Sequence, residues 1–248
     1  MRVGHLGQDG RAPTPGPGEI GRQPRRIATG HRNSVAVCRS GAGCAAGVGY
    51  RRAWQTRAVM DAEEFWALID DACAEVDARE PDFDDRRDAI ERACEERLVG
   101  RAPAEIVGFS LRQWQLRDHA YRYDLWAAAF LIEGWWSDDG FMDFRDGLIS
   151  LGRNWYERAL ADPDALADHP AVRDGGDVLI GNEDFNRAAH RAYQRLTGEP
   201  DGLNAALEAS PEAVPLRVMT EPAGVRWDVA DGDEVRRRLP RLAGIFLD

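Results

Sequence analysis

The residues most able to do chemistry in this sequence are two adjacent carboxylates, Asp138 and Asp139, with Arg145 downstream and Asp124 upstream. A carboxylate pair flanked by arginines can bind a cation or a basic peptide, and a desolvated acid there can act as a general base. The alternative is structural. The two acids would form the first turn of a helix and complement its dipole, while Arg145 and Arg153 tie helices together. Acidic first turns are common, which favours the structural interpretation.

Aromatic residues surround these acids. Tyr121, Tyr123, Trp126, Trp135 and Trp136 are candidates for an aromatic pocket that holds a ligand or a cation. Core packing explains Trp126 better. Consecutive tryptophans at a helix end cannot both point the same way, so we expect at least one of Trp135 and Trp136 at a surface or an interface, where tryptophan is enriched.

Other catalytic patterns are missing. His119, His169 and His190 are far apart and lack the pairing with carboxylates that metal-binding helices use, so a lone His119 is expected to be structural or to face solvent. There is no Gly-rich phosphate loop and no nucleophile elbow. We therefore expect no catalytic residue, no metal and no cofactor. The four cysteines show no metal-ligand spacing, and the last two lie on expected helix faces, which indicates a reduced, cytoplasmic chain: Cys38, Cys44, Cys73 and Cys94.

Charge is distributed unevenly along the chain. Residues 1–59 hold ten arginines against two acids, whereas residues 60–248 hold 22 arginines against 41 acids, a balance of −19, and lysine is absent. An acidic surface repels phosphate backbones, which argues against nucleic acid or an anionic membrane as a partner and leaves proteins, cations or small molecules. No run of eighteen apolar residues occurs, so the sequence predicts no membrane span.

Residues 1–59 are rich in Gly, Arg and Pro and have no hydrophobic period. One explanation is a disordered N-terminal extension. The other, which we favour, is that Met60 is the true start and the segment is translated upstream sequence, because GC-rich genomes yield this residue mixture in spurious reading frames.

The helical period appears at once after Met60. The fold class expected is mostly α: a single helical domain, residues 60–248, of about five helices. The Pro-punctuated segment 199–248 is expected to be irregular, with one strand-like piece at 225–229. The apolar period and the capping residues place the helices at 62–79, 83–98, 103–131, 137–161 and 182–197.

Several motifs carry a resemblance to a known family. They are MDAEEFWALIDDA from Met60, Trp126 with three alanines, Ser137-Asp138-Asp139-Gly140-Phe141, Phe144-Arg145, Gly152-Arg153 and the end from Trp227 to LPRL. Over about residues 60–248 the chain resembles the bacterial family known as domain of unknown function 4240. The resemblance implies a predominantly helical domain in soluble, mostly actinobacterial proteins, with no established activity and a start at Met60. The chain departs from the family at Trp135 and Trp136, where smaller or more polar residues are expected, so a pocket at this turn is not expected to be the same in all members.

Our leading hypothesis is a cytoplasmic, non-enzymatic interaction module. It would bind a basic protein partner, as a regulatory or immunity-like protein does, through the surface around Trp135, Trp136, Asp138 and Asp139. The alternative is an enzyme, or a binder of a small ligand or metal, with a carboxylate site between the third and fourth expected helices.

Overall fold

The computed structural model describes residues 59–79, 82–134, 137–175, 179–217 and 221–247. All of these residues belong to one contact-defined unit, residues 46–248. Apart from Val59, the predicted N-terminal extension lies outside the described residues, so its state stays a prediction. Within the described part the regular elements are helices, which confirms the mostly α fold class.

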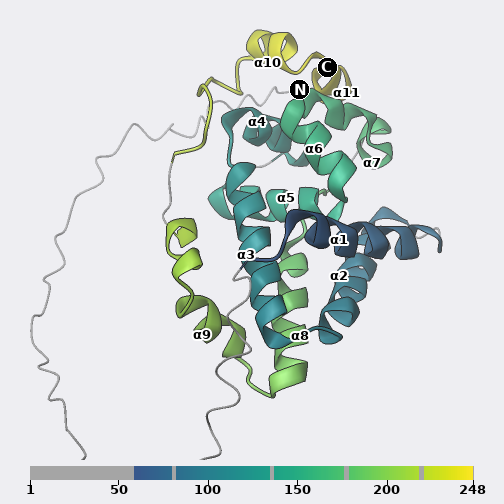
Figure 1. Cartoon of the computed structure of the whole chain (residues 1–248). Coiled ribbons are helices and arrows are strands. Elements are labelled where there is room, and N and C mark those ends of the chain that lie inside the picture. Colours follow the sequence, from purple (N-terminus) through teal and green to yellow (C-terminus); the bar gives the residue numbers. More distant parts are fainter. Residues whose placement is uncertain (1–58, 80–81, 135–136, 176–178, 218–220, 248) are drawn as a thin grey trace, which may run out of the picture. The chain divides into compact units, whose positions relative to one another are not determined.

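The chain forms α-helices of ordinary length in its first two thirds and shorter ones after that (Figure 1). Short 3₁₀ helices join several of them. The α-helices are α1 (Ala62–Asp77), α2 (Phe83–Val99), α3 (Pro103–His119), α4 (Tyr123–Glu133), α5 (Asp138–Ser150), α6 (Arg153–Ala161), α7 (Pro170–Arg173), α8 (Arg187–Thr197), α9 (Gly202–Glu208), α10 (Gly232–Arg238) and α11 (Pro240–Phe246). The 3₁₀ helices are η2 (Pro163–Asp168), η3 (Glu183–Asn186), η4 (Pro211–Ala213) and η5 (Pro215–Arg217).

Helix starts and stops follow the capping residues. The Asp61 carboxylate accepts a hydrogen bond from the Glu63 amide at 2.9 Å and caps α1. Pro103 opens α3, where its missing amide proton costs nothing. Gly134 and Gly198 end α4 and α8 with φ of 72° and 75°, a left-handed conformation that glycine adopts without strain.

The expected third helix, 103–131, is in fact two helices. The chain breaks between α3 and α4, where Arg122 is extended with φ −138° and ψ 144°. The Ala223 amide donates to the Tyr121 carbonyl at 2.8 Å, and the Ala223 carbonyl accepts from the Tyr123 amide at 3.0 Å. These two bonds replace helical ones and form an isolated parallel bridge between residues 122 and 223. A partner a hundred residues away therefore decides where α3 ends.

The expected fourth helix, 137–161, is also two helices, and the expected strand does not form. Gly152 separates α5 from α6 with φ of 95°. Residues 225–229 have no strand pairing, and helices α9 to α11 occupy part of the segment expected to be irregular. The count of about five helices was therefore too low, because breaks inside amphipathic stretches leave the apolar period almost unchanged.

The helices pack around α5 and α8. α8 packs between α2 and α3, and α9 covers the outer side of α3 and α8 (Figure 1). α5 packs on α3, α4 and α6 and buries Phe141, Phe144 and Leu148. α11 packs on η2 and α4. Cys73 and Cys94 are buried free thiols, as expected of small apolar residues. Every helix in the described ranges is too short or too polar to cross a bilayer.

Candidate functional site

Asp138 and Asp139 lie in the first turn of α5, as the sequence predicts. The Ser137 hydroxyl accepts a hydrogen bond from the Gly140 amide at 3.0 Å, so the helix cap is supplied by serine and not by either acid. Both carboxylates are exposed, and neither forms an ion pair or a side-chain hydrogen bond with another described residue. Trp135 and Trp136 lie outside the described residues, so the aromatic part of this candidate surface stays a prediction.

Asp124 is engaged elsewhere. Its carboxylate pairs with the Arg122 guanidinium at 2.6 and 3.0 Å and accepts the Leu125 amide at 2.9 Å. Arg122 also donates to the Leu160 carbonyl at 3.1 Å, at the end of α6. Asp124 therefore fastens the start of α4 to α6.

Arg145 ties α5 to the end of α3. It donates to the Phe141 carbonyl at 3.1 Å and to the Arg117 carbonyl at 2.9 Å. Its guanidinium also lies 4.6 Å from the centre of the Tyr121 ring and 4.9 Å from that of Phe141. Burial, with a contribution from the charge of Arg117, lowers the pKa of Arg145 to about 10. Arg145 thus has the structural role that the sequence analysis favoured for it.

The aromatic residues divide between the core and the surface. Trp126 stacks on Phe141 with ring centres 4.8 Å apart and is 8% exposed, in agreement with core packing. Tyr121 lies against the same pair, 6.0 Å from each ring. Tyr123 instead donates its hydroxyl proton to the Glu221 carboxylate at 2.8 Å. The five aromatic candidates therefore do not line one common pocket: Trp126 packs in the core and Tyr123 faces residue 221.

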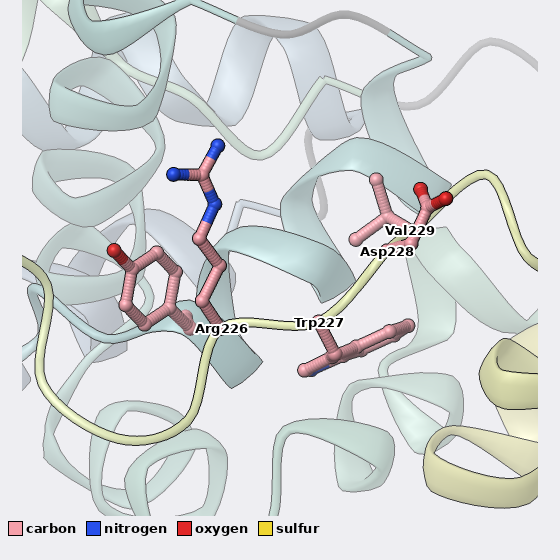
Figure 2. A pocket seen from close by; sticks show the side chains of 5 residues that line it. Arg226, Trp227, Asp228 and Val229 are labelled. Carbon is pink, nitrogen blue, oxygen red and sulfur yellow. The ribbon is translucent and has the colours of Figure 1, made fainter.

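A cavity of about 500 Å³ lies beside Tyr123, along the extended segment 226–229. Figure 2 shows the Arg226 side chain rising from one side of this segment and the Trp227 ring lying on the other. Arg226 is exposed and has no ion pair with a described residue. The guanidinium carbon of Arg238 lies 5.3 Å from the centre of the Trp227 ring. The sequence analysis did not single out this cavity, since the segment was expected to be a strand.

Two carboxyl groups with raised proton affinity were missed. Glu133 accepts a hydrogen bond from the Gly181 amide at 2.7 Å, and burial raises its pKa to about 7. Burial and then the neighbouring charges of Glu183, Asp146 and Asp139 raise the pKa of Asp143 to about 6. The signal in the sequence was weak, because a single acid at a helix end is the usual solvent-facing pattern. The burial of Glu133 depends on the segment 179–182.

A buried ion pair between Asp146 and Arg117 lies on the inner side of α5. Asp146 is 2% exposed and accepts from Gln113 and from Arg117, both at 3.0 Å. It is the carboxylate that lies between the third and fourth expected helices. Both of its oxygens are occupied by side chains of α3. In the part of the chain that the structure describes, no three His, Cys, Asp or Glu side chains are placed to hold a metal ion.

A second cavity, of about 430 Å³, is lined by Phe83, Trp155 and His169 together with Asp77 and Arg86. His169 is 6% exposed, and its Nδ1 accepts the Ala171 amide at 3.3 Å. Burial, and then the charge of Arg86, lower the pKa of His169 to about 4, so its imidazole is neutral at pH 7. The sequence analysis found no pairing for this histidine, and its neighbours come from three separate helices.

The comparison with known families confirms the resemblance. Residues 60–195 match the family model described as a protein of unknown function, DUF4240. This chain belongs to the DUF4240 family. The match runs from the residue before the cap of α1 into α8 and includes Asp138, Asp139 and His169, whereas the Trp227-to-LPRL motif lies beyond it. The DUF4240 description carries no activity. No curated protein and no solved structure matches the chain.

Proposed function

We propose that this DUF4240 protein is an interaction module that docks a basic protein partner on the acidic face of α5. This face consists of Asp138, Asp139, Met142 and Asp143, in which Met142 lies four and three residues after the first two acids and Asp143 lies four after Asp139. Met142 is 36% exposed and places an apolar side chain among the acids. A mixture of apolar contact and surrounding charge is what protein interfaces use.

The observation that carries the proposal is that Asp138, Asp139 and Asp143 form no ion pair with a described residue, although the charge of Arg117 acts on Asp143. Elsewhere arginines and acids pair closely, as Arg195 does with Glu95 and Glu96 at 2.7 and 2.5 Å. The raised pKa of Asp143 reflects its burial and the negative charges of Glu183, Asp146 and Asp139. A basic partner would relieve that repulsion and approach faster because of it.

The test is capture of a partner from native lysate. The bait is the full chain, beside a twin that carries Asp138→Asn and Asp139→Asn. A matched control carries Asp88→Asn and Glu208→Gln, which remove two charges from the exposed outer sides of α2 and α9. A bait that begins at Met60 is run in parallel, because the ten arginines of residues 1–59 would compete for the face.

We expect wild type and control to retain the same stoichiometric partner and the twin to lose it while melting normally. Loss of two charges at an interface should slow association about tenfold and flatten its salt dependence. A twin that keeps the partner, or baits that capture nothing, would contradict the proposal.

The alternative, a carboxylate site for an enzyme or a metal binder, has less support. Glu133 and Asp143 are the carboxyl groups of suitable proton affinity, but Glu133 is hydrogen-bonded to the backbone of the segment 179–182. A melting temperature that rises with Mg²⁺, Mn²⁺, Zn²⁺ or a nucleotide would favour this alternative, since a ligand of the native state stabilises it.

A further inference from the structure

The cavity around His169 lies where four helices meet, at a distance in sequence from the acidic face of α5. Asp77 comes from the end of α1, Phe83 and Arg86 from the start of α2, Trp155 from α6 and His169 from the residue before α7. Its volume of about 430 Å³ falls in the lower part of the range of about 300–1,000 Å³ typical of small-molecule sites. Helix ends and packed helices position every one of these side chains.

One wall of the cavity is aromatic. The centre of the His169 ring lies 5.4 Å from Phe83 and 4.8 Å from Trp155, with interplanar angles of 64° and 69°. Arg158 covers the Trp155 ring, with its guanidinium carbon 4.3 Å from the ring centre. These contacts fix the rings before any ligand arrives, which lowers the entropy cost of binding a flat molecule.

His169 supplies a hydrogen-bond donor at this wall. Because its Nδ1 accepts the Ala171 amide, the proton of the neutral imidazole is on Nε2. Nε2 has no hydrogen-bond partner among the described residues, although the residue is 6% exposed. Nε2 is not among the side-chain atoms that are buried without a partner, so it is open to the cavity, where an acceptor on a ligand can receive its proton.

The cavity is also lined by an ion pair without net charge. Arg86 donates to both Asp77 oxygens, at 2.6 and 3.3 Å. The Arg86 side chain is 15% exposed, whereas that of Asp77 is 54% exposed and can accept a further hydrogen bond. The Asp77 charge and the balance of −19 over residues 60–248 disfavour phosphates and carboxylates, while Arg86 disfavours cations. The polar groups thus match an uncharged ligand that presents one acceptor and one donor.

We propose that this cavity binds a neutral, planar heteroaromatic molecule of the nucleobase or nucleoside class, without a phosphate group. Its ring packs against Phe83 and Trp155, an acceptor on its edge receives the His169 Nε2 proton, and a donor faces the Asp77 carboxylate. The sugar of a nucleoside extends toward solvent. This site is independent of the partner-binding face, so the failure of either proposal leaves the other intact.

The test is calorimetric titration of the full chain with adenosine, guanosine, cytidine and uridine. Their 5′-monophosphates, benzoate and benzamidine serve as the anionic and cationic comparisons. We expect at least one nucleoside to bind and its monophosphate to bind about tenfold more weakly or not at all. Binding of benzoate or benzamidine without binding of any nucleoside would overturn the proposal, and so would the absence of nucleoside binding at millimolar concentration.

Variants tie the binding to the cavity. His169→Asn keeps an acceptor for the Ala171 amide but removes the ring and the proton donor at the position of Nε2, so affinity should fall about tenfold or more. Trp155→Phe should weaken binding several-fold, and Asp88→Asn on the outer side of α2 should not change it. Each variant is first checked for a wild-type melting transition. Nucleoside affinity that survives both His169→Asn and Asp77→Asn in folded protein would place the ligand elsewhere and overturn the assignment.

Discussion

Replacing Glu133 by glutamine should stabilise the protein at high pH and leave it unchanged at low pH. Glu133 ends α4, and its carboxyl accepts the Gly181 amide at 2.7 Å. Arg87 donates to the Gly181 carbonyl at 2.9 Å, so the segment 179–182 is held from two sides. Glutamine has nearly the same shape and keeps an acceptor oxygen for the Gly181 amide, but it has no charge to desolvate.

The size and sign of the effect follow from linkage. Burial raises the pKa of Glu133 from its ordinary value of 4.5 to about 7. Because the pKa of Glu133 is higher in the folded state, its protonated carboxyl adds to the free energy of unfolding. This contribution is complete below the pKa of the unfolded state and is lost as pH rises through the pKa of the folded state. The shift corresponds to about 3 kcal/mol at about 1.4 kcal/mol per pKa unit, and residual contact with solvent reduces this to about 1–2 kcal/mol. Glu133→Gln should therefore be more stable than wild type by about 1–2 kcal/mol at pH 8 and equal to it near pH 4.5.

The assay is urea unfolding of wild type, Glu133→Gln and a control, Glu208→Gln, at several values between about pH 4.5 and pH 8. Glu208 is exposed on α9, so its substitution should change the free energy of unfolding little at any pH. The reasoning is wrong, and Glu133 is bound as a carboxylate, if Glu133→Gln has a lower free energy of unfolding than wild type at the highest pH tested. It is also wrong if the difference in free energy of unfolding does not grow with pH.

Three further substitutions test the packing of α5. Gly147→Ala should lower the free energy of unfolding by about 3 kcal/mol or more, because the new Cβ would lie 2.0 Å from the Ile180 carbonyl oxygen. A urea midpoint equal to that of wild type would show that the segment 179–182 moves to make room for the Cβ. Asp146→Ala should cost about 3–5 kcal/mol by leaving Arg117 without its buried partner, and a loss below 1 kcal/mol in chemical unfolding would mean that solvent replaces it. Ser137→Ala should cost about 1 kcal/mol in melting experiments by removing the cap of α5, unless Asp138 takes over as cap.

The helix boundaries that local chemistry decides were predictable. Asp61, Pro103 and Ser137 start helices, and Gly134 and Gly198 end them, because each satisfies or removes a backbone constraint within one turn of the chain. The core position of Trp126 also followed from the apolar stretch around it. Caps and apolar period need no information from distant residues.

The features that were missed depend on distant residues. α3 ends where the backbone of Ala223 forms hydrogen bonds with the Tyr121 carbonyl and the Tyr123 amide, and the sequence near those two residues gives no sign of this contact. Asp124 and Arg145 looked like neighbours of the α5 acids, yet the structure uses Asp124 to hold Arg122 and Arg145 to hold the end of α3. Glu133 and His169 acquire their altered pKa values mainly from burial in the folded chain, where Glu133 meets Gly181 and His169 lies near the charge of Arg86, both far away in sequence. The sequence alone does not say which distant residues come into contact, so it cannot assign such environments.

α5 combines a firmly anchored inner side with an outer face whose three carboxylates form no ion pair with a described residue. On the inner side Arg145 and Asp146 join it to α3, and Phe141 stacks on Trp126 of α4. Because these contacts fix the helix, the carboxylates of Asp138 and Asp139 are presented in one arrangement, and a partner that docks there orders little besides side chains. If the acidic face of α5 binds a partner as proposed, conservative changes on this outer face should alter binding without altering folding, because the contacts that hold α5 in place lie on its inner side.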